Sequence, residues 1–221
     1  MKPGIILVTG GARSGKSAFA QELAMEIGGP VVYIATAEGR DPEMRDRIIK
    51  HQAARPSSWQ TVEAPLDLAE AIRSASINTA VVLIDCLTLF VNNLFLQELG
   101  PLDETENPAI DPRIETKIET KIEGIIQAAQ SVSTVIIFVS NEVGAGLVPP
   151  YNLGRSYRDV MGRVNQQIAK VATQIFWVNC GLALELKSLA VTPKQAITAP
   201  TGSILKHRPI FQRTRWWRIG R

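Results

Sequence analysis

The stretch from residue 5 to residue 17, IILVTGGARSGKS, decides the fold of this chain. Gly10, four further residues and then Gly15-Lys16-Ser17 form the complete phosphate-binding signature G-x-x-x-x-G-K-S. The residues before Gly10 are apolar or β-branched, as in a buried parallel strand. Apolar residues then recur at four-residue spacing up to residue 27, which predicts a helix. Strand, loop and helix in this order predict that the chain binds a nucleoside triphosphate.

The residue types of this loop predict its chemistry. Glycines let backbone N–H groups close around an anion that a Cβ would obstruct. The helix that begins near Gly15 places the positive end of its dipole beneath the phosphates. We expect Lys16 to reach the β- and γ-phosphates and Ser17 to ligate Mg²⁺.

Composition limits what the rest of the chain can be. With 221 residues, 45% of them hydrophobic, the chain can bury one substantial core, so we expect one main domain. Its apolar runs are shorter than the roughly 18 residues of a membrane span, and the N-terminal run is too short for a signal peptide. Cys86 and Cys180 are too few for a disulfide framework and suit a reducing cytosol. We therefore expect a cytoplasmic protein with no transmembrane segment.

The net charge of +3 hides an asymmetry between the body of the chain and its C-terminus. Residues 187–221 hold 8 of the 24 basic residues and none of the 21 acidic ones, so the body carries an excess of acid. We expect residues 1–186 to form the nucleotide-binding catalytic domain and residues 187–221 to form a loosely structured basic tail.

Strand and helix signals alternate along the chain. This alternation predicts an α/β fold with a mostly parallel sheet flanked by helices. Two apolar runs around Cys180-Gly181 predict an antiparallel hairpin at the edge of the sheet. Ligands of such sheets bind at the carboxyl ends of the strands. The predicted strands cover residues 5–9, 30–35, 59–62, 80–84, 134–139, 175–179 and 182–186.

Two side chains outside the loop are candidates for chemistry. Asp85 directly follows the apolar run VVLI, and we expect it to hold Mg²⁺, directly or through water; capping the next helix is a compatible role. His51 lies four residues from both Arg47 and Arg55, on one face if the helix extends that far. Such a ladder fits a triphosphate, and two nearby cations favour a neutral, nucleophilic imidazole. A surface histidine without a chemical role is the alternative.

Three further features are less decisive. Glu142 and the glycines after it form either a substrate loop or a turn. The polar helix that carries Arg155, Arg158 and Arg163 forms either an anion site or a subunit contact. In the helix with its apolar stripe over Ile114–Ile125, glutamates repeat every four residues, so we expect packing rather than ion pairing to hold it.

The chain resembles the bifunctional adenosylcobinamide kinase / adenosylcobinamide-phosphate guanylyltransferase family of cobalamin biosynthesis. The resemblance covers residues 5 to 186, and its most specific part is the combination of H-x-x-x-R-P-x-x-W with S-N-E-V-G. Where the family usually reads V-P-E-N, this chain has Val148-Pro149-Pro150-Tyr151. The matching stretches are ILVTGGARSGKS, VYIATA, DPEMRDRI, the motif that begins at His51, Glu63, LIDCLTL, VSNEVGAGLVP and RDVMGRVNQ.

The resemblance implies a RecA-like P-loop NTPase fold, a homotrimer and two reactions. The enzyme phosphorylates the aminopropanol hydroxyl of adenosylcobinamide with GTP or ATP, and then transfers GMP from GTP to that phosphate. The motif match places the covalent GMP carrier on His51, beside Lys16 as the other catalytic residue. The implied nucleotide contacts are Gly10, Gly11, Ala12, Arg13, Ser14, Gly15, Lys16, Ser17, Ala35, Thr36, Ala37, Gln52, Ala53, Ala54, Arg55, Glu63 and Asp85.

Two other interpretations are compatible with the same loop. A single-activity small-molecule kinase would keep the loop but give His51 a structural role. A nucleotide-switched binding protein would use the basic tail, whose segment RTRWWRIGR mixes arginine with tryptophan, to touch nucleic acid or membrane. Three prolines interrupt the tail, so we expect an enzyme without a nucleic-acid partner.

Overall fold

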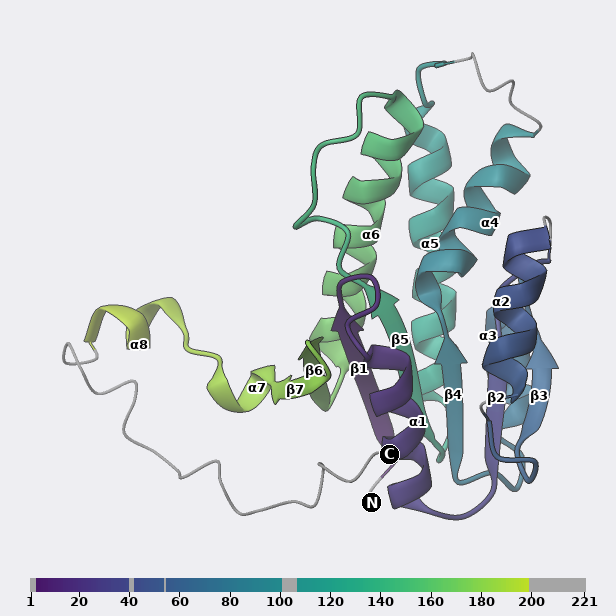
Figure 1. Cartoon of the computed structure of the whole chain (residues 1–221). Helices are drawn as coiled ribbons and strands as arrows, with labels where there is room; N and C mark the ends of the chain where they lie inside the picture. The colour runs from purple at the N-terminus through teal and green to yellow at the C-terminus, as the bar shows by residue number, and fades with distance from the viewer. Residues whose placement is uncertain (1–2, 40–41, 54, 101–106, 199–221) are drawn as a thin grey trace, which may run out of the picture. The chain divides into compact units, whose positions relative to one another are not determined.

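One seven-stranded sheet organises the described part of the chain (Figure 1). The computed structural model describes residues 3–39, 42–53, 55–100 and 107–198. Its strands are β1 (Gly4–Gly10), β2 (Val31–Ala35), β3 (Gln60–Glu63), β4 (Val81–Asp85), β5 (Val135–Asn141), β6 (Gln174–Asn179) and β7 (Leu182–Glu185). They lie in the order β3-β2-β4-β5-β1-β6-β7. All neighbours pair in parallel except β6 and β7, which are antiparallel.

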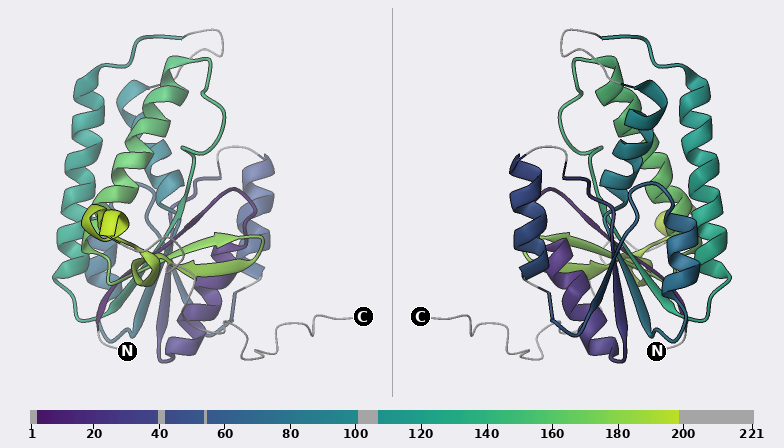
Figure 2. Two further views of the ribbon diagram at one scale, coloured as in Figure 1. Left: turned by 90° about the vertical axis from the view of Figure 1, so that its left-hand side faces the viewer. Right: turned by 90° about the vertical axis from the view of Figure 1, so that its right-hand side faces the viewer.

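Helices cover both faces of this sheet. Figure 2 shows α1 and α2 on one face and α3, α4, α5 and α6 on the other. In Figure 1, helices α4, α5 and α6 extend past the carboxyl ends of the strands. The helices are α1 (Lys16–Ile27), α2 (Pro42–Ala53), α3 (Leu68–Ala75), α4 (Leu87–Leu99), α5 (Pro112–Gln130), α6 (Asn152–Val171), α7 (Leu186–Leu189) and α8 (Pro193–Thr198).

Strands β1, β2, β4 and β5 are buried on both faces, which explains their continuous apolar sequences. Along β1, Ile5 and Leu7 join the cluster under α3 to α6, whereas Ile6 and Val8 join the cluster under α1. The same alternation runs through β2, β4 and β5, so every second residue of each strand faces α1. This parity decides which polar residues at the strand ends can meet the phosphate loop.

The predicted parallel sheet with an antiparallel edge hairpin is confirmed. Its strand order has one consequence that no single segment of sequence indicates. β5 pairs with both β1 and β4, so it separates the strand before the phosphate loop from the strand that ends at Asp85. Residues that end β5 therefore lie between these two candidate site elements.

Ion pairs join α5 to α6, contrary to the expectation that packing alone holds α5. The guanidinium of Arg163 on α6 bonds Glu115 at 2.6 Å and Glu119 at 2.5 Å. The repeated glutamates are thus paired across the helix interface rather than along their own helix. Two other arginines of α6 bond carbonyls of the loop before it: Arg158 bonds Gly144 at 2.7 Å, and Arg155 bonds Pro149 and Pro150.

By its internal contacts the chain divides into residues 1–187 and residues 188–221. In the second unit, Thr192 and Gln195 cap α8 reciprocally: each side chain accepts a hydrogen bond from the backbone N–H of the other. The sequence pattern predicts neither α7 nor α8. The Trp- and Arg-rich segment of the basic tail lies outside the described residues. Among the described helices, none combines the length and apolarity needed to cross a bilayer.

Candidate functional site

The phosphate-loop residues form a turn between β1 and α1. Ser14 N–H donates to the Gly11 carbonyl at 3.3 Å, and α1 begins directly afterwards at Lys16. Gly15 has a φ of 96°, a left-handed conformation that favours glycine. Gly11, Ala12 and Arg13 form the exposed outer part of the turn, whereas Ser14 and Lys16 are buried. The predicted order of strand, loop and helix is therefore present, with α1 pointing its N-terminus at the loop.

The β6–β7 hairpin supports the loop from behind. Its turn residue Gly181 donates its N–H to the Ser14 carbonyl at 2.8 Å. A Cβ added to Gly10 would lie 2.3 Å from the Val178 carbonyl oxygen, and one added to Gly15 would lie 3.1 Å from the Gly181 Cα. Both loop glycines are thus needed for close packing against the hairpin as well as for approach to an anion.

Lys16 sits at the start of α1 with its ammonium group turned back on the loop. Its Nζ donates to the Gly11 carbonyl at 3.1 Å. Burial lowers the pKa of Lys16, and the neighbouring Cys86 and Asp85 partly offset this effect. A phosphate group would add further negative charge beside this buried ammonium.

Asp85 ends β4 beside two residues of the neighbouring strand. It is in register with Ala35 of β2, and the buried Tyr33 lies two residues earlier on the same face. Burial raises the pKa of the Tyr33 phenol, and the charge and hydrogen bond of Asp85 raise that pKa further. The Asp85 Oδ2 atom is buried and has no hydrogen-bond partner among the described residues. Tyr33 is a site residue that the sequence analysis missed, because a tyrosine within an apolar strand reads as core.

Arg55 covers the other side of Tyr33. Its guanidinium carbon lies 3.3 Å from the centroid of the ring, and its Nη1 donates to Thr61 Oγ1 at 3.4 Å. The Nε atom of Arg55 is buried without a partner among the described residues. Arg55, the arginine of the H-x-x-x-R-P motif, therefore packs on the same tyrosine whose phenol is influenced by Asp85.

Asn141 ends β5, and Glu142 follows it at the same edge of the sheet. Asn141 is in register with Gly10, and Glu142 donates its N–H to the Gly10 carbonyl at 3.0 Å. The Asn141 Oδ1 atom is buried and unpartnered among the described residues. The Glu142 carboxylate accepts the Gly144 N–H at 2.8 Å, which orders the following loop. In the sequence, Glu142 is a candidate site residue, whereas Asn141 is only a member of the S-N-E-V-G motif.

Other predicted nucleotide contacts lie at the carboxyl ends of β2 and β3. Ala35, Thr36 and Ala37 lie at the carboxyl end of β2, but the Thr36 hydroxyl is engaged with both backbone groups of Cys86, at 2.7 and 2.9 Å. Glu63 ends β3 in register with Ala35, and its side chain is exposed.

The carboxyl-terminal part of α2 carries the remaining predicted contacts. His51 belongs to this helix, and its side chain lies outside what the structure describes, as does that of Arg47. Gln52 and Ala53 are exposed, and Ala54 lies outside the described residues.

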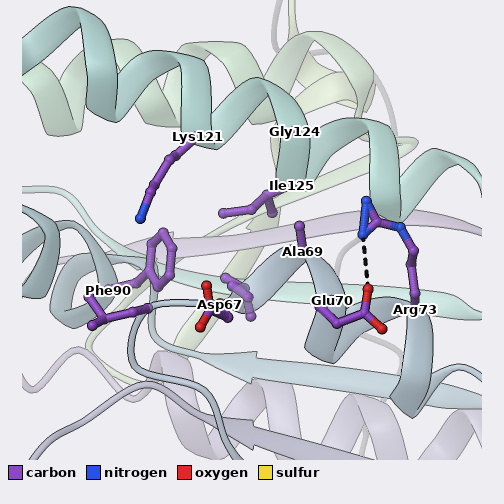
Figure 3. Close-up of a pocket in the computed structure, with 10 residues that line it drawn as sticks. Asp67, Ala69, Glu70, Arg73, Phe90, Lys121, Gly124 and Ile125 are labelled. Carbon is purple, nitrogen blue, oxygen red and sulfur yellow. Dashed lines mark hydrogen bonds and ion pairs between the residues drawn. The ribbon is translucent and has the colours of Figure 1, made fainter.

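A cavity of about 310 Å³ lies away from this edge, between α3, α5 and the start of α4 (Figure 3). An exposed ion pair between Arg73 and Glu70, at 3.5 Å, forms one part of its wall. Lys121 and Ile125 of α5 and Phe90 of α4 line its other walls. None of the predicted nucleotide contacts lines this cavity, so its position assigns it no part in the phosphate chemistry.

The fold and the loop define a P-loop nucleotide-binding protein, as the sequence predicts. A family model for cobinamide kinase / cobinamide phosphate guanyltransferase matches residues 6–186, and this chain belongs to that family. The bifunctional adenosylcobalamin biosynthesis protein CobU of Escherichia coli (strain K12) is 40% identical over 185 residues, which are 83% of this chain and 99% of that protein. CobP of Pseudomonas aeruginosa is 40% identical over 181 residues, which are 82% of this chain and 96% of that protein.

A solved structure supports the same fold. The chain is similar to an ATPase from the type III secretion system of pathogenic bacteria, with a TM-score of 0.50 and 11% sequence identity. The match covers 87% of this chain and 61% of that one. At this identity the likeness concerns the fold alone.

Proposed function

We propose that this chain phosphorylates adenosylcobinamide and then transfers GMP from GTP to the adenosylcobinamide phosphate. One observation carries the proposal: the phosphate loop, Lys16 and the unpartnered Asp85 Oδ2 meet at one edge of the sheet. They do so in a chain whose family match covers residues 6–186. Phosphoryl and nucleotidyl transfer both need a site that binds a triphosphate and offsets its charge.

In the kinase step, the substrate hydroxyl oxygen attacks the γ-phosphorus and the bond to the β-phosphate oxygen breaks. Lys16 and the N-terminus of α1 stabilise the charge that develops on the phosphates. The buried, unpartnered Asp85 Oδ2 and the Ser17 hydroxyl at the start of α1 are oxygens that suit Mg²⁺. When bound there, Mg²⁺ would neutralise phosphate charge and orient the triphosphate.

In the guanylyl step, a nitrogen of His51 attacks the α-phosphorus of GTP and pyrophosphate leaves. An oxygen of the adenosylcobinamide phosphate then attacks the same phosphorus, and the P–N bond breaks to release the histidine. A covalent carrier divides one difficult displacement into two easier ones. Arg55, four residues after His51, supports this assignment because it reaches the Asp85 side of the site through Tyr33.

The deciding experiment incubates the full chain with GTP labelled at the α- or the γ-phosphate, followed by denaturation. The proposal expects α-label to stay on the protein in a bond that acid breaks and alkali does not, as in a phosphoramidate. It also expects γ-label on adenosylcobinamide when that substrate is added. Absence of protein-bound α-label, with γ-transfer intact, would make the chain a single-activity kinase.

We also propose that residues 1–186 hold both activities and that the basic tail is dispensable for them. The family match ends at residue 186, and the alignment with the Escherichia coli relative covers 83% of this chain but 99% of that protein. A chain that lacks residues 190–221 should carry out both reactions at wild-type rates in dilute buffer. An inactive or insoluble truncation would place the tail within the catalytic fold.

We infer, finally, a homotrimer in the cytoplasm. Leu147, Val148 and Tyr151, in the loop before α6, are 97%, 65% and 53% exposed, and apolar side chains this exposed suit a subunit contact. Analytical ultracentrifugation of the full chain should give three times the 24.2 kDa chain mass. Replacing Leu147 and Val148 with serine should shift the protein toward the monomer if these residues form the contact.

A further inference from the structure

Among the buried side-chain oxygens without a hydrogen-bond partner in the described part of the chain, two end the adjacent strands β4 and β5. They are Asp85 Oδ2 at the end of β4 and Asn141 Oδ1 at the end of β5. A buried acceptor left without a donor destabilises the fold, so such atoms need an explanation. The role expected of Asp85 explains one of them. No role derived so far uses Asn141.

Strand parity puts the two oxygens on the same face. Val81 and Leu83 of β4, and Val139 of β5, pack in the cluster under α1. Asp85 lies two residues after Leu83, and Asn141 lies two residues after Val139. Because alternate residues of a strand share a face, both side chains project toward the side of the sheet that carries α1. Asn141 is in register with Gly10 at the start of the phosphate loop, and Asp85 with Val139. Asn141 therefore lies between the loop and Asp85.

The backbone of Asn141 is held firmly although its side-chain oxygen is free. Its N–H donates to Thr88 Oγ1 at 2.9 Å, and its carbonyl accepts from Asn165 Nδ2 at 3.1 Å. Asn165 also accepts the Ser140 hydroxyl at 2.6 Å. These bonds tie the end of β5 to α4 and α6, so the free oxygen is presented from a fixed position.

We propose that Asn141 is a positioning residue of the metal–nucleotide site, whose Oδ1 accepts a hydrogen bond from a water bound to Mg²⁺. Mg²⁺ keeps several waters and takes few protein oxygens, so it needs acceptors for those waters near its carboxylate. The amide oxygen carries no net charge, so it does not repel the Asp85 carboxylate as a second carboxylate would. The inference deepens the proposed function but rests only on its nucleotide site, because cobinamide takes no part in it.

The experiment measures how much Mg²⁺ tightens nucleotide binding. The full-length protein is titrated calorimetrically with the β,γ-imido analogue of GTP, once in EDTA and once in excess MgCl₂. The ratio of the two affinities is the metal-linked gain. In Asn141→Leu this gain should fall about tenfold, as expected for losing one hydrogen bond to a charged assembly, while the affinity in EDTA stays near wild type.

Two further variants make the test specific. Thr9→Val is the matched control, since Thr9 Oγ1 is another buried, unpartnered oxygen but lies on the opposite face by strand parity. Its metal-linked gain should equal that of wild type. Asn141→Asp keeps the shape and adds a carboxylate, so its affinity in EDTA should fall and its metal-linked gain should rise. This variant carries the test if Asn141→Leu does not fold.

An unchanged metal-linked gain in both Asn141 variants would overturn the proposal. So would equal weakening by Asn141→Leu in EDTA and in MgCl₂, which would make Asn141 a structural support of the loop. Neither result depends on cobinamide chemistry. The proposed function can therefore fail, by absence of label transfer from GTP, while this inference stands.

Discussion

The guanidinium carbon of Arg55 lies 3.3 Å from the centroid of the Tyr33 ring, and Asp85 on the neighbouring strand helps to raise the pKa of the Tyr33 phenol. This contact joins the segment that follows α2 to the carboxyl end of β4. His51 belongs to the last turn of α2. The contact between Arg55 and Tyr33 therefore links the segment of the proposed GMP carrier to the strand end that holds the proposed metal ligand. A change at Tyr33 should therefore be felt in the use of Mg²⁺.

Tyr33→Phe removes only the hydroxyl and leaves the ring under Arg55. Because Asp85 then loses its interaction with the phenol hydroxyl, the Mg²⁺ concentration for half-maximal kinase rate should rise about fivefold, as expected for losing a polar contact to a charged group. Kinase rate as a function of Mg²⁺ concentration gives the measurement. Tyr157→Phe is the control, since that partly buried hydroxyl donates to the Thr88 carbonyl instead. Equal Mg²⁺ requirements in both variants would contradict a role for Tyr33 at the metal site.

Lys16→Ala should lower the kinase rate by at least about a hundredfold, because the lysine supplies charge that balances the phosphates in the transition state. The fold should persist, since the Lys16 ammonium makes one described hydrogen bond, to the Gly11 carbonyl. Steady-state rates and circular dichroism measure the two effects. Lys170→Ala, an exposed lysine on α6, provides the control. Near-normal phosphorylation by a folded Lys16→Ala protein would refute the assignment.

His51→Asn should abolish GMP transfer while reducing the kinase rate by less than about tenfold, since direct phosphoryl transfer needs no covalent carrier. Both half-reactions are assayed on the same preparation. Asp46→Asn changes an exposed residue of the same helix and should affect neither. If both reactions fall equally, His51 contributes to nucleotide binding in general; if GMP transfer survives, His51 is not the nucleophile.

Cys86 should make the free energy of unfolding fall as the pH rises in the alkaline range. Burial raises the pKa of its thiol from 9.0 to about 11, and the nearby Asp85 charge adds to this. The unfolded chain therefore releases the proton first, so the stabilisation is complete below pH 9.0 and is lost as pH rises toward about 11. The free energy of unfolding in urea should fall more in wild type than in Cys86→Ala over this interval, by on the order of 2 kcal/mol. Parallel curves for the two proteins would contradict this; Cys180→Ala, which removes an exposed thiol, should behave like wild type.

Two helix glycines should respond oppositely to alanine. A Cβ at Gly124, inside α5 beside the cavity of Figure 3, meets no atom within 4 Å. Gly124→Ala should therefore stabilise the protein by about 0.5–1 kcal/mol. A Cβ at Gly154 would lie 2.5 Å from Tyr151 Cε2 and 2.7 Å from Pro149 Cβ, so Gly154→Ala should destabilise by about 1–3 kcal/mol. Urea unfolding of both variants checks the signs, and a shared sign would contradict the argument.

Local signals determined much of the fold. The phosphate loop is a contiguous signature, and the apolar runs of β1, β2, β4 and β5 are long enough to be read as buried strands. The Lys16 and Ser17 assignments follow from the same signature and stay predictions until tested. Helix boundaries were less determined: α6 begins at Asn152, and the sequence of the polar helix does not mark this start, because capping depends on the loop before it.

Only the tertiary structure decided what meets at the carboxyl edge. Tyr33, Arg55 and Asn141 come from separate parts of the chain, and long-range pairing brings them to Asp85. The insertion of β5 between β1 and β4 is a matter of strand order, which local periodicity does not encode. The glutamates of α5 likewise look unpaired in sequence, because Arg163, their partner, approaches from another helix. Neighbouring residues in the sequence determine the chemistry of the phosphate loop, whereas the partners of a buried polar group depend on the packing of the whole sheet.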